Sequence, residues 1–276
     1  MNEHKAIDAI VDKWVDRRSF AKAAFGAGLG AAVLGGVGVS AQGPTITDTD
    51  ILNFALNLEY LEAEFYTVIT SGVTIDQAPF NIGISGLGTP GPTTGAARLD
   101  LSSDARLSQS AFEIAYDERA HVALLRNALG SAAVAKPAID FSAGGVTTVA
   151  RFLQVARILE DVGISAYGGA APLIADRGIL GTAARIALAE GLHGGIVRMQ
   201  MAQRNLPDIG PVDASDIVVS TNPRIGARLV SVDAQGLTAV RTPSQVMSIV
   251  YGPNAPAGTQ RGLLYPNGLN GVINTV

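Results

Sequence analysis

The 276-residue sequence contains no cysteine. This absence excludes disulfide bonds, thiolate zinc sites, iron–sulfur clusters and a thiol nucleophile. A metal ion bound by this chain must therefore take oxygen ligands and imidazole nitrogen. That choice of ligands suits manganese, iron or zinc.

Aromatic residues and net charge are also scarce. Only 5% of the residues are aromatic, and the formal net charge is −4 at pH 7, so the sequence lacks the basic surface that binds nucleic acid. Glycine is abundant, with 32 residues, and 47% of the chain is hydrophobic. This composition favours closely packed helices joined by glycine-rich loops, in one domain with appendages.

The N-terminal region has the three parts of an export signal. Arg17 and Arg18 lie in a segment, residues 16–22, that resembles the twin-arginine export motif. An apolar run follows at 23–39 and ends in small residues typical of a cleavage site. The run is short and glycine-rich for a membrane-spanning helix. We expect residues 1–41 to be removed and the mature protein to be periplasmic, extracellular or in the cell envelope, without stable membrane insertion.

Four later segments carry hydrophobic residues at helical spacing. The four predicted helices cover residues 50–71, 104–129, 147–171 and 180–205. The connection at 130–146 spans roughly 50 Å when extended, which is enough to cross the length of a bundle. The longer glycine- and proline-rich stretch at 72–101 is expected to be an ordered excursion. The predicted fold class is all-α, with a four-helix bundle at 48–205.

Residues 206–276 are predicted to form an extension that packs on the bundle. Their pattern is compatible with short strands at 217–220, 228–232 and 237–241, with a turn at 233–236, and with a short helix at 243–251.

Three of the helices place charged residues on the face that a bundle must bury. These residues are Glu118 and His121 in the second helix, Glu160 in the third, and Glu190 and His193 in the fourth. In the second helix, the pair lies between Ile114 and Leu125 on the 3–4 spacing of a buried face. In the third helix, Gly163 follows the acid by one turn and leaves space beside it.

The first helix offers two inward acids. A row of polar residues predicts its outer face; the row comprises Asn53, Asn57, Tyr60, Glu64 and Thr67. Glu64 is accordingly expected to be solvated. Glu62 points away from this row. With a helix rotation of 100° per residue, Glu59 lies about 120° from Asn53, where the row starts. Both should face inward, and the rotation favours Glu62.

Buried carboxylates need a cation because an unpaired charge in an apolar core is costly. At least four acids, one on each helix and each near its middle, are explained together by two metal ions. His121 and His193 both lie in Glu-x-x-His pairs, and the third histidine, His4, belongs to the leader. The pattern Glu … Glu-x-x-His … Glu … Glu-x-x-His is the ligand set of a di-iron carboxylate bundle. Other acids near these faces, Glu113, Asp117 and Asp161, are expected to be solvated.

The same pattern resembles the ferritin-like superfamily, which includes bacterioferritins and rubrerythrins. Residues 51–66, 241–252 and 266–268 further resemble exported ferritin-like proteins related to plant desiccation-associated proteins. The resemblance covers essentially all of the mature chain. It implies a ferritin-like up-down-down-up four-helix bundle with a long connection between its first two helices and an irregular C-terminal extension. These two departures from ferritins proper argue against a storage cage.

In that superfamily, the ligand of the first helix is commonly followed seven residues later by a tyrosine. Glu59 and Tyr66 match this spacing, and Glu160 and Tyr167 repeat it. The resemblance therefore favours Glu59, whereas helix rotation favours Glu62, and both remain candidates. The two tyrosines are candidates to hydrogen-bond the ligands or to carry electrons, and packing alone is an equal alternative.

The resemblance implies a centre of two iron ions, or alternatively manganese. The expected ligands are Glu59 or Glu62, Glu118, His121, Glu160, Glu190 and His193. The expected partners are these metal ions with dioxygen or peroxide, in a ferroxidase- or peroxidase-type activity of an exported stress protein. The alternatives are a manganese catalase-like enzyme and a non-enzymatic stress-protective or structural bundle with a vestigial metal site. A homo-oligomer is compatible with each of these functions.

Overall fold

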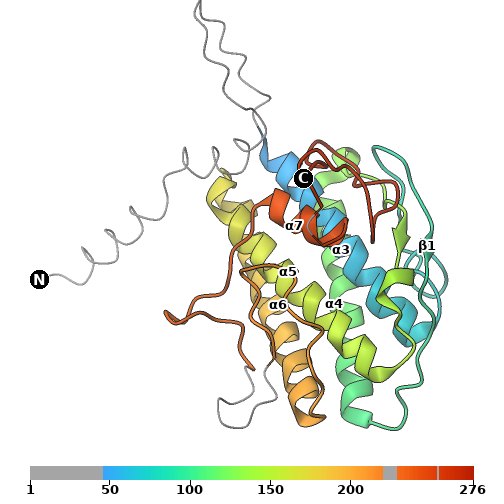
Figure 1. Ribbon diagram of the computed structural model, residues 1–276. Coiled ribbons are helices and arrows are strands. Elements are labelled where there is room, and N and C mark those ends of the chain that lie inside the picture. Colours follow the sequence, from blue (N-terminus) through green and yellow to red (C-terminus); the bar gives the residue numbers. More distant parts are fainter. Residues whose placement is uncertain (1–45, 220–228, 254) are drawn as a thin grey trace, which may run out of the picture.

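The computed structural model describes residues 46–219, 229–253 and 255–276. Four long helices dominate the molecule (Figure 1); they are α3 (Asp48–Ser71), α4 (Ala105–Leu129), α5 (Val149–Ala170) and α6 (Arg177–Gln203). The four helices expected from the sequence are therefore confirmed, and their ends lie close to the predicted ones. The predicted leader at 1–41 lies outside the described residues.

The local sequence fixes where α3 begins and ends. Thr47 and Asp50 form a capping box, in which each side chain accepts a hydrogen bond from the other residue's backbone N–H. Gly72 follows the helix with a φ of 84°, in the left-handed region that glycine adopts without strain. The other three long helices also begin at residues whose side chains cap them, namely Asp104, Thr148 and Asp176.

The helices pack as two pairs, α3 with α4 and α5 with α6, while α3 also borders α5 and α4 borders α6. Asp48 at the start of α3 accepts hydrogen bonds of 2.8 Å from the backbone N–H groups of Ala175 and Asp176, just before α6. These two helices therefore begin at the same end. Asp104 at the start of α4 pairs with Arg204 directly after α6, so α4 and α6 run antiparallel. The arrangement is the predicted up-down-down-up bundle.

The excursion between α3 and α4 is ordered, as predicted. It is joined to the connection between α4 and α5 by a short parallel ladder, in which β1 (Thr93–Thr94) pairs with β2 (Ile139–Asp140). A single bridge between Leu87 and Val134 continues the contact. The two longest connections of the bundle thus hold each other along one of its sides, where Figure 1 labels β1.

The C-terminal extension is mostly irregular. The predicted short helix is confirmed as α7 (Pro243–Val250), which packs on α5. The predicted turn at 233–236 is also present, closed by a 2.8 Å hydrogen bond from the Asp233 N–H to the Leu237 carbonyl. The strand predictions were wrong, because the described parts of 217–220, 228–232 and 237–241 form no strand. Among the described residues, none of the helices has the length and apolar character needed to cross a membrane.

The prediction of a solvated outer face on α3 was also wrong. Every residue of the predicted polar row is buried, and Glu64 has no exposed surface. Lys136 Nζ, from the connection between α4 and α5, lies 3.3 Å from the Glu64 carboxylate. Asn57 donates a 2.8 Å hydrogen bond to the Asn270 carbonyl, and its own carbonyl accepts one of 2.7 Å from Tyr265. The connections and the extension cover the sides of α3 that α4 and α5 leave free, so its polar residues bind the covering segments.

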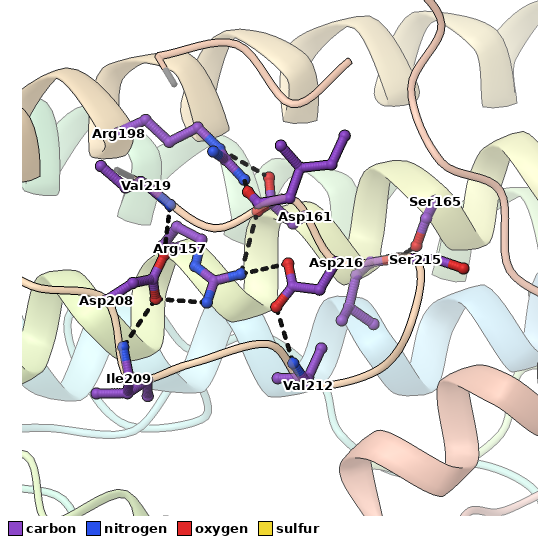
Figure 2. A network of polar contacts seen from close by, with 12 residues as sticks. Arg157, Asp161, Ser165, Arg198, Asp208, Ile209, Val212, Ser215, Asp216 and Val219 are labelled. Atoms are coloured by element: carbon purple, nitrogen blue, oxygen red, sulfur yellow. Dashed lines mark hydrogen bonds and ion pairs between the residues drawn. The ribbon is translucent and has the colours of Figure 1, made fainter. Parts of the chain in front are cut away.

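Asp161, which was expected to face solvent, lies in a buried network of ion pairs (Figure 2). Arg157 on α5 pairs with Asp208 at 2.5 Å and with Asp216 at 2.6 Å. Arg198 on α6 pairs with Asp161 itself. The network fastens the start of the C-terminal extension to α5 and α6.

Candidate metal centre

Six of the predicted ligands lie in the middle of the bundle and are almost completely buried. Their exposed fractions are 1% for Glu59, 0% for Glu118, Glu160 and Glu190, 9% for His121 and 4% for His193. Each helix contributes at the same depth because the pairs run antiparallel and the acids are central. The helical spacing of each Glu-x-x-His pair turns both side chains toward the same interior.

The first group of ligand atoms comes from three helices. Glu59, Glu118, His121 and Glu190 each offer one atom within 4.8 Å of the others. His121 Nδ1 lies 3.2 Å from Glu59 Oε2, 3.4 Å from Glu118 Oε2 and 3.4 Å from Glu190 Oε1. One imidazole nitrogen is therefore surrounded by three carboxylates.

A second group shares two members with the first. It contains Glu118, Glu160, Glu190 and His193, again within 4.8 Å of one another. His193 Nδ1 lies 2.9 Å from Glu118 Oε1 and 3.5 Å from Glu160 Oε2. Because Glu118 and Glu190 belong to both groups, two neighbouring ions bound here would share them as bridging carboxylates.

Most donor atoms of these groups make no hydrogen bond, although the two histidines lie within ion-pair distance of the carboxylates. Within the two groups, eight buried atoms have no hydrogen-bond partner among the described residues: Glu59 Oε2, both oxygens of Glu118, His121 Nδ1, Glu160 Oε2, both oxygens of Glu190, and His193 Nδ1. Native proteins rarely leave such atoms unpaired. Carboxylate oxygen and imidazole nitrogen converging from four helices are the ligands that iron and manganese take, so the residues fit a pair of such ions.

In the metal-free cluster, burial and the neighbouring charges shift the pKa of each acid and each histidine. Burial raises the pKa of Glu59 to about 7. Burial opposes ionisation of Glu118 too, but the two histidines outweigh it and lower the pKa of Glu118 to about 2. Burial lowers the pKa of His193, yet Glu118 and Glu160 outweigh it and raise that pKa to about 12. The pKa of Glu190 is raised well above its usual value by burial and by the charge of Glu118. In the metal-free protein, protons on these acids and histidines therefore compensate the negative charge that metal cations would otherwise compensate.

Glu62 lies beside the cluster but outside both groups. It is 3% exposed, and burial together with the neighbouring carboxylates raises its pKa well above the usual value. A Cβ atom on Gly163 would lie 3.1 Å from one Glu62 oxygen and 2.7 Å from Glu190 Oε2. The glycine therefore makes the space in which these two carboxylates lie. Of the two candidates on α3, the structure brings Glu59 into the first group.

The two predicted tyrosines contact ligands on the opposite helix. Tyr66 on α3 donates a hydrogen bond of 2.5 Å to Glu160 Oε1, and Tyr167 on α5 donates one to Glu59 Oε1. In both acids the second oxygen has no hydrogen-bond partner. Each tyrosine therefore holds one carboxylate oxygen and leaves the other directed at the cluster.

Asp117 was missed as a residue of the site. Its side chain is 46% exposed, but its carboxylate lies 3.1 Å from His193 Nε2. A ligating histidine commonly donates its second ring N–H to a carboxylate, which fixes the tautomer and leaves the other nitrogen for the metal. The sequence signal was the position of Asp117 directly before Glu118, on the side of α4 that turns toward α6.

Comparison with known proteins gives one family match. A family model described as a ferritin-like domain matches residues 47–203. These residues include all four long helices and every residue of both groups. The search of curated proteins gives no match.

Proposed function

Because this chain belongs to the family of ferritin-like domains, we propose that its bundle holds two iron ions and catalyses ferroxidase- or peroxidase-type redox chemistry. The observation that supports this proposal is the set of eight buried donor atoms without a hydrogen-bond partner, which converge from four helices in two overlapping groups. Iron bound there supplies the electrons that reduce dioxygen or hydrogen peroxide.

The residues divide into three roles in this proposal. Glu59 and His121 would hold one ion, Glu160 and His193 would hold the other, and Glu118 and Glu190 would contribute to both. Tyr66 and Tyr167 orient the terminal carboxylates through their hydroxyl groups. The enclosing helices exclude bulk water, because the exposed fraction of every ligand is below 10%.

The proposal extends to the place of action. The twin-arginine-like segment at 16–22 and the apolar run after it favour export of the protein to the periplasm or cell envelope. The twin-arginine route transports folded proteins, which suits a metal centre assembled before export. A role in protection against oxidative or desiccation stress is consistent with removal of iron and peroxide outside the cytoplasm.

Anaerobic titration of the purified protein with Fe(II), followed by addition of oxygen or peroxide, tests the activity. Two ions per chain and an oxygen-dependent absorbance change are expected. Glu118→Gln should lose both ions, because both groups share Glu118. Glu113→Gln on the exposed side of the same helix is the matched control and should bind two.

The same experiment separates the alternatives. Peroxide loss without added reductant after loading with Mn(II) would identify a manganese catalase-like enzyme instead. Metal binding with no change on adding oxygen or peroxide would identify a structural metal in a non-enzymatic bundle. No metal binding at all would refute the proposal.

A further inference from the structure

The outer surface of α6 is apolar, although it faces solvent. Four large side chains are exposed along it: Leu188 (71%), Leu192 (69%), Ile196 (40%) and Met199 (44%). Among the exposed residues between positions 184 and 199, Arg185 is the only charged one. Helix surfaces that remain in contact with water are normally polar, so this face has the character of a surface that another molecule covers.

The neighbouring helix α4 enlarges the apolar face. Phe112 is 49% exposed and Tyr116 is 66% exposed. The contacts of Asp104 with Arg204 and of Asp117 with His193 set the antiparallel register of the two helices, which places these aromatic residues level with Ile196 and Leu192. From their exposed fractions, the six large side chains present on the order of 600 Å². With the small residues between them, the face approaches the ~800 Å² per partner of a standard protein interface.

No contact within the described residues requires glycine at two positions on this face. A Cβ atom on Gly191 or on Gly195 would meet nothing within 4 Å. Glycine in a helix interior costs roughly 1 kcal/mol relative to alanine. Gly163 on α5 is different, because a Cβ there would lie 2.7 Å from Glu190. The hollows at Gly191 and Gly195 are explained if a second helix approaches α6 closely from outside.

We propose that this face binds the same face of a second copy of the chain, with the two α6 helices antiparallel about a two-fold axis between Gly191 and Leu192. The pairs that face each other across the axis are Leu188 with Gly195 and Ala184 with Met199. The two copies of Leu192 lie against each other beside the axis. Leu188 and Met199 therefore each meet a small residue, and the contact is self-complementary, as a two-fold interface requires.

The charges fit the same arrangement. The two-fold axis places Arg185 of the second copy at the same height as residue 198 of the first copy. On the antiparallel α4 of the first copy, Glu113 lies within about one turn of that height. Both side chains are exposed. The two arginines themselves lie roughly 20 Å apart along the helices, so they do not repel each other strongly. Each copy thus offers one cation and one anion to the other.

The axis also lies level with Asp117 and His193. A second copy bound in this way covers the exposed edge of Asp117, whose carboxylate contacts the histidine of the metal centre. The dimer contact itself uses residues on the opposite side of α6 from the ligands, so it does not depend on the proposed redox activity.

Light scattering during size-exclusion chromatography tests the oligomeric state of the purified protein. The unaltered chain should have twice the mass of a monomer, and Leu188→Glu with Leu192→Glu should be monomeric with unchanged helical circular dichroism. Leu237→Glu, at a side chain 62% exposed on the extension, is the matched control and should remain dimeric. Glu113→Arg and Arg185→Glu should each raise the dimer dissociation constant by about 10-fold or more, and the two together should restore it.

Cysteine cross-linking tests the register without background, because the chain contains no cysteine. A mixture of Leu188→Cys and Gly195→Cys should form an intermolecular disulfide. Leu188→Cys alone should not, because its two copies lie roughly 10 Å apart along the helices and a disulfide needs Cα atoms within about 7 Å. Three results would each overturn the proposal: a monomer at every concentration, a dimer that cross-links through Leu188→Cys alone, or a monomer that binds phosphatidylcholine vesicles through this face.

Discussion

Tyr66 on α3 donates a hydrogen bond of 2.5 Å to Glu160 on α5. In the opposite direction, Tyr167 on α5 donates a hydrogen bond to Glu59 on α3. Each tyrosine lies seven residues after the acid of its own helix and binds the acid of the other helix. Since Glu59 and Glu160 belong to different groups of ligand atoms, each tyrosine supports one half of the centre.

We expect replacement of Tyr66 by phenylalanine to weaken mainly the half of the centre that contains Glu160. Loss of a partner that orients a ligand typically lowers metal affinity by about 10- to 100-fold. Tyr167→Phe should weaken mainly the half that contains Glu59, so the two variants serve as controls for each other. Stepwise titration with Co(II), followed by its visible spectrum, measures the two affinities. An equal effect on both halves in each variant would contradict the division.

A methyl group at Gly163 should damage the centre without unfolding α5. In Gly163→Ala the new Cβ would lie 2.7 Å from Glu190 Oε2, so this bridging carboxylate must move. The expected result is loss of at least one bound ion, measured as metal content after dialysis. Gly181→Ala on α6 is the control, since a Cβ there meets nothing within 4 Å among the described residues. That control should retain both ions and stabilise its helix by roughly 0.5–1 kcal/mol.

Removal of the Arg157 guanidinium should release the start of the C-terminal extension. Arg157→Met leaves Asp208 and Asp216 buried without their cation, and breaking a buried pair in this way costs about 3–5 kcal/mol. Urea unfolding measures the loss of stability, and limited proteolysis should cut near residues 206–219 first. The exposed Arg261→Met should change neither measurement. Unchanged protease resistance in Arg157→Met would show that other contacts hold the segment.

The metal-free protein should become less stable as the pH rises through the acidic range. The pKa of Glu59 is raised by burial from 4.5 to about 7, so the folded state binds its proton more tightly than the unfolded state does. The stabilisation is complete below the unfolded pKa and is lost as the pH rises through the folded one. For Glu59 alone the free energy of unfolding should fall on the order of 3 kcal/mol between these values.

Urea unfolding of the metal-free protein at pH 4.5 and pH 7.5 measures this fall. Loading with metal should reverse it, because the ions replace the protons as the compensating charge and bind more tightly once the carboxylates are ionised. A metal-free protein that is more stable at pH 7.5 than at pH 4.5 would contradict the raised pKa of the buried acids.

The four helices and the convergence of their acids were predictable because both follow from local periodicity. Glu118, His121, Glu190 and His193 repeat one short spacing on the buried faces of their helices. The rotation of α3 was harder to read, since that helix is buried on every side and has no single polar face to orient it. Glu59 and Glu62 could therefore be separated only by the tertiary structure.

Both errors arose because segments outside the four helices cover the polar sides of α3 and α5. Glu64 and Asp161 were expected to be solvated because each lies on the polar side of its helix. In the structure, Lys136 covers the first, and Arg157 and Arg198 cover the second. Lys136, which pairs with Glu64, comes from a segment without regular periodicity. The same is true of Asp208 and Asp216, which pair with Arg157. Their positions depend on long-range contacts that helical spacing does not report.

The enclosure of α3 also constrains how the chain reaches its final state. Asn57 is hydrogen-bonded to Asn270, which follows it by 213 positions, and the hydroxyl group of Tyr265 donates a hydrogen bond to the Asn57 carbonyl. A ribosome therefore releases the helical hairpins long before it releases the segment that closes over them. Until then the first long helix keeps an uncovered side, and the nascent chain needs protection from aggregation even after the rest of the bundle has formed.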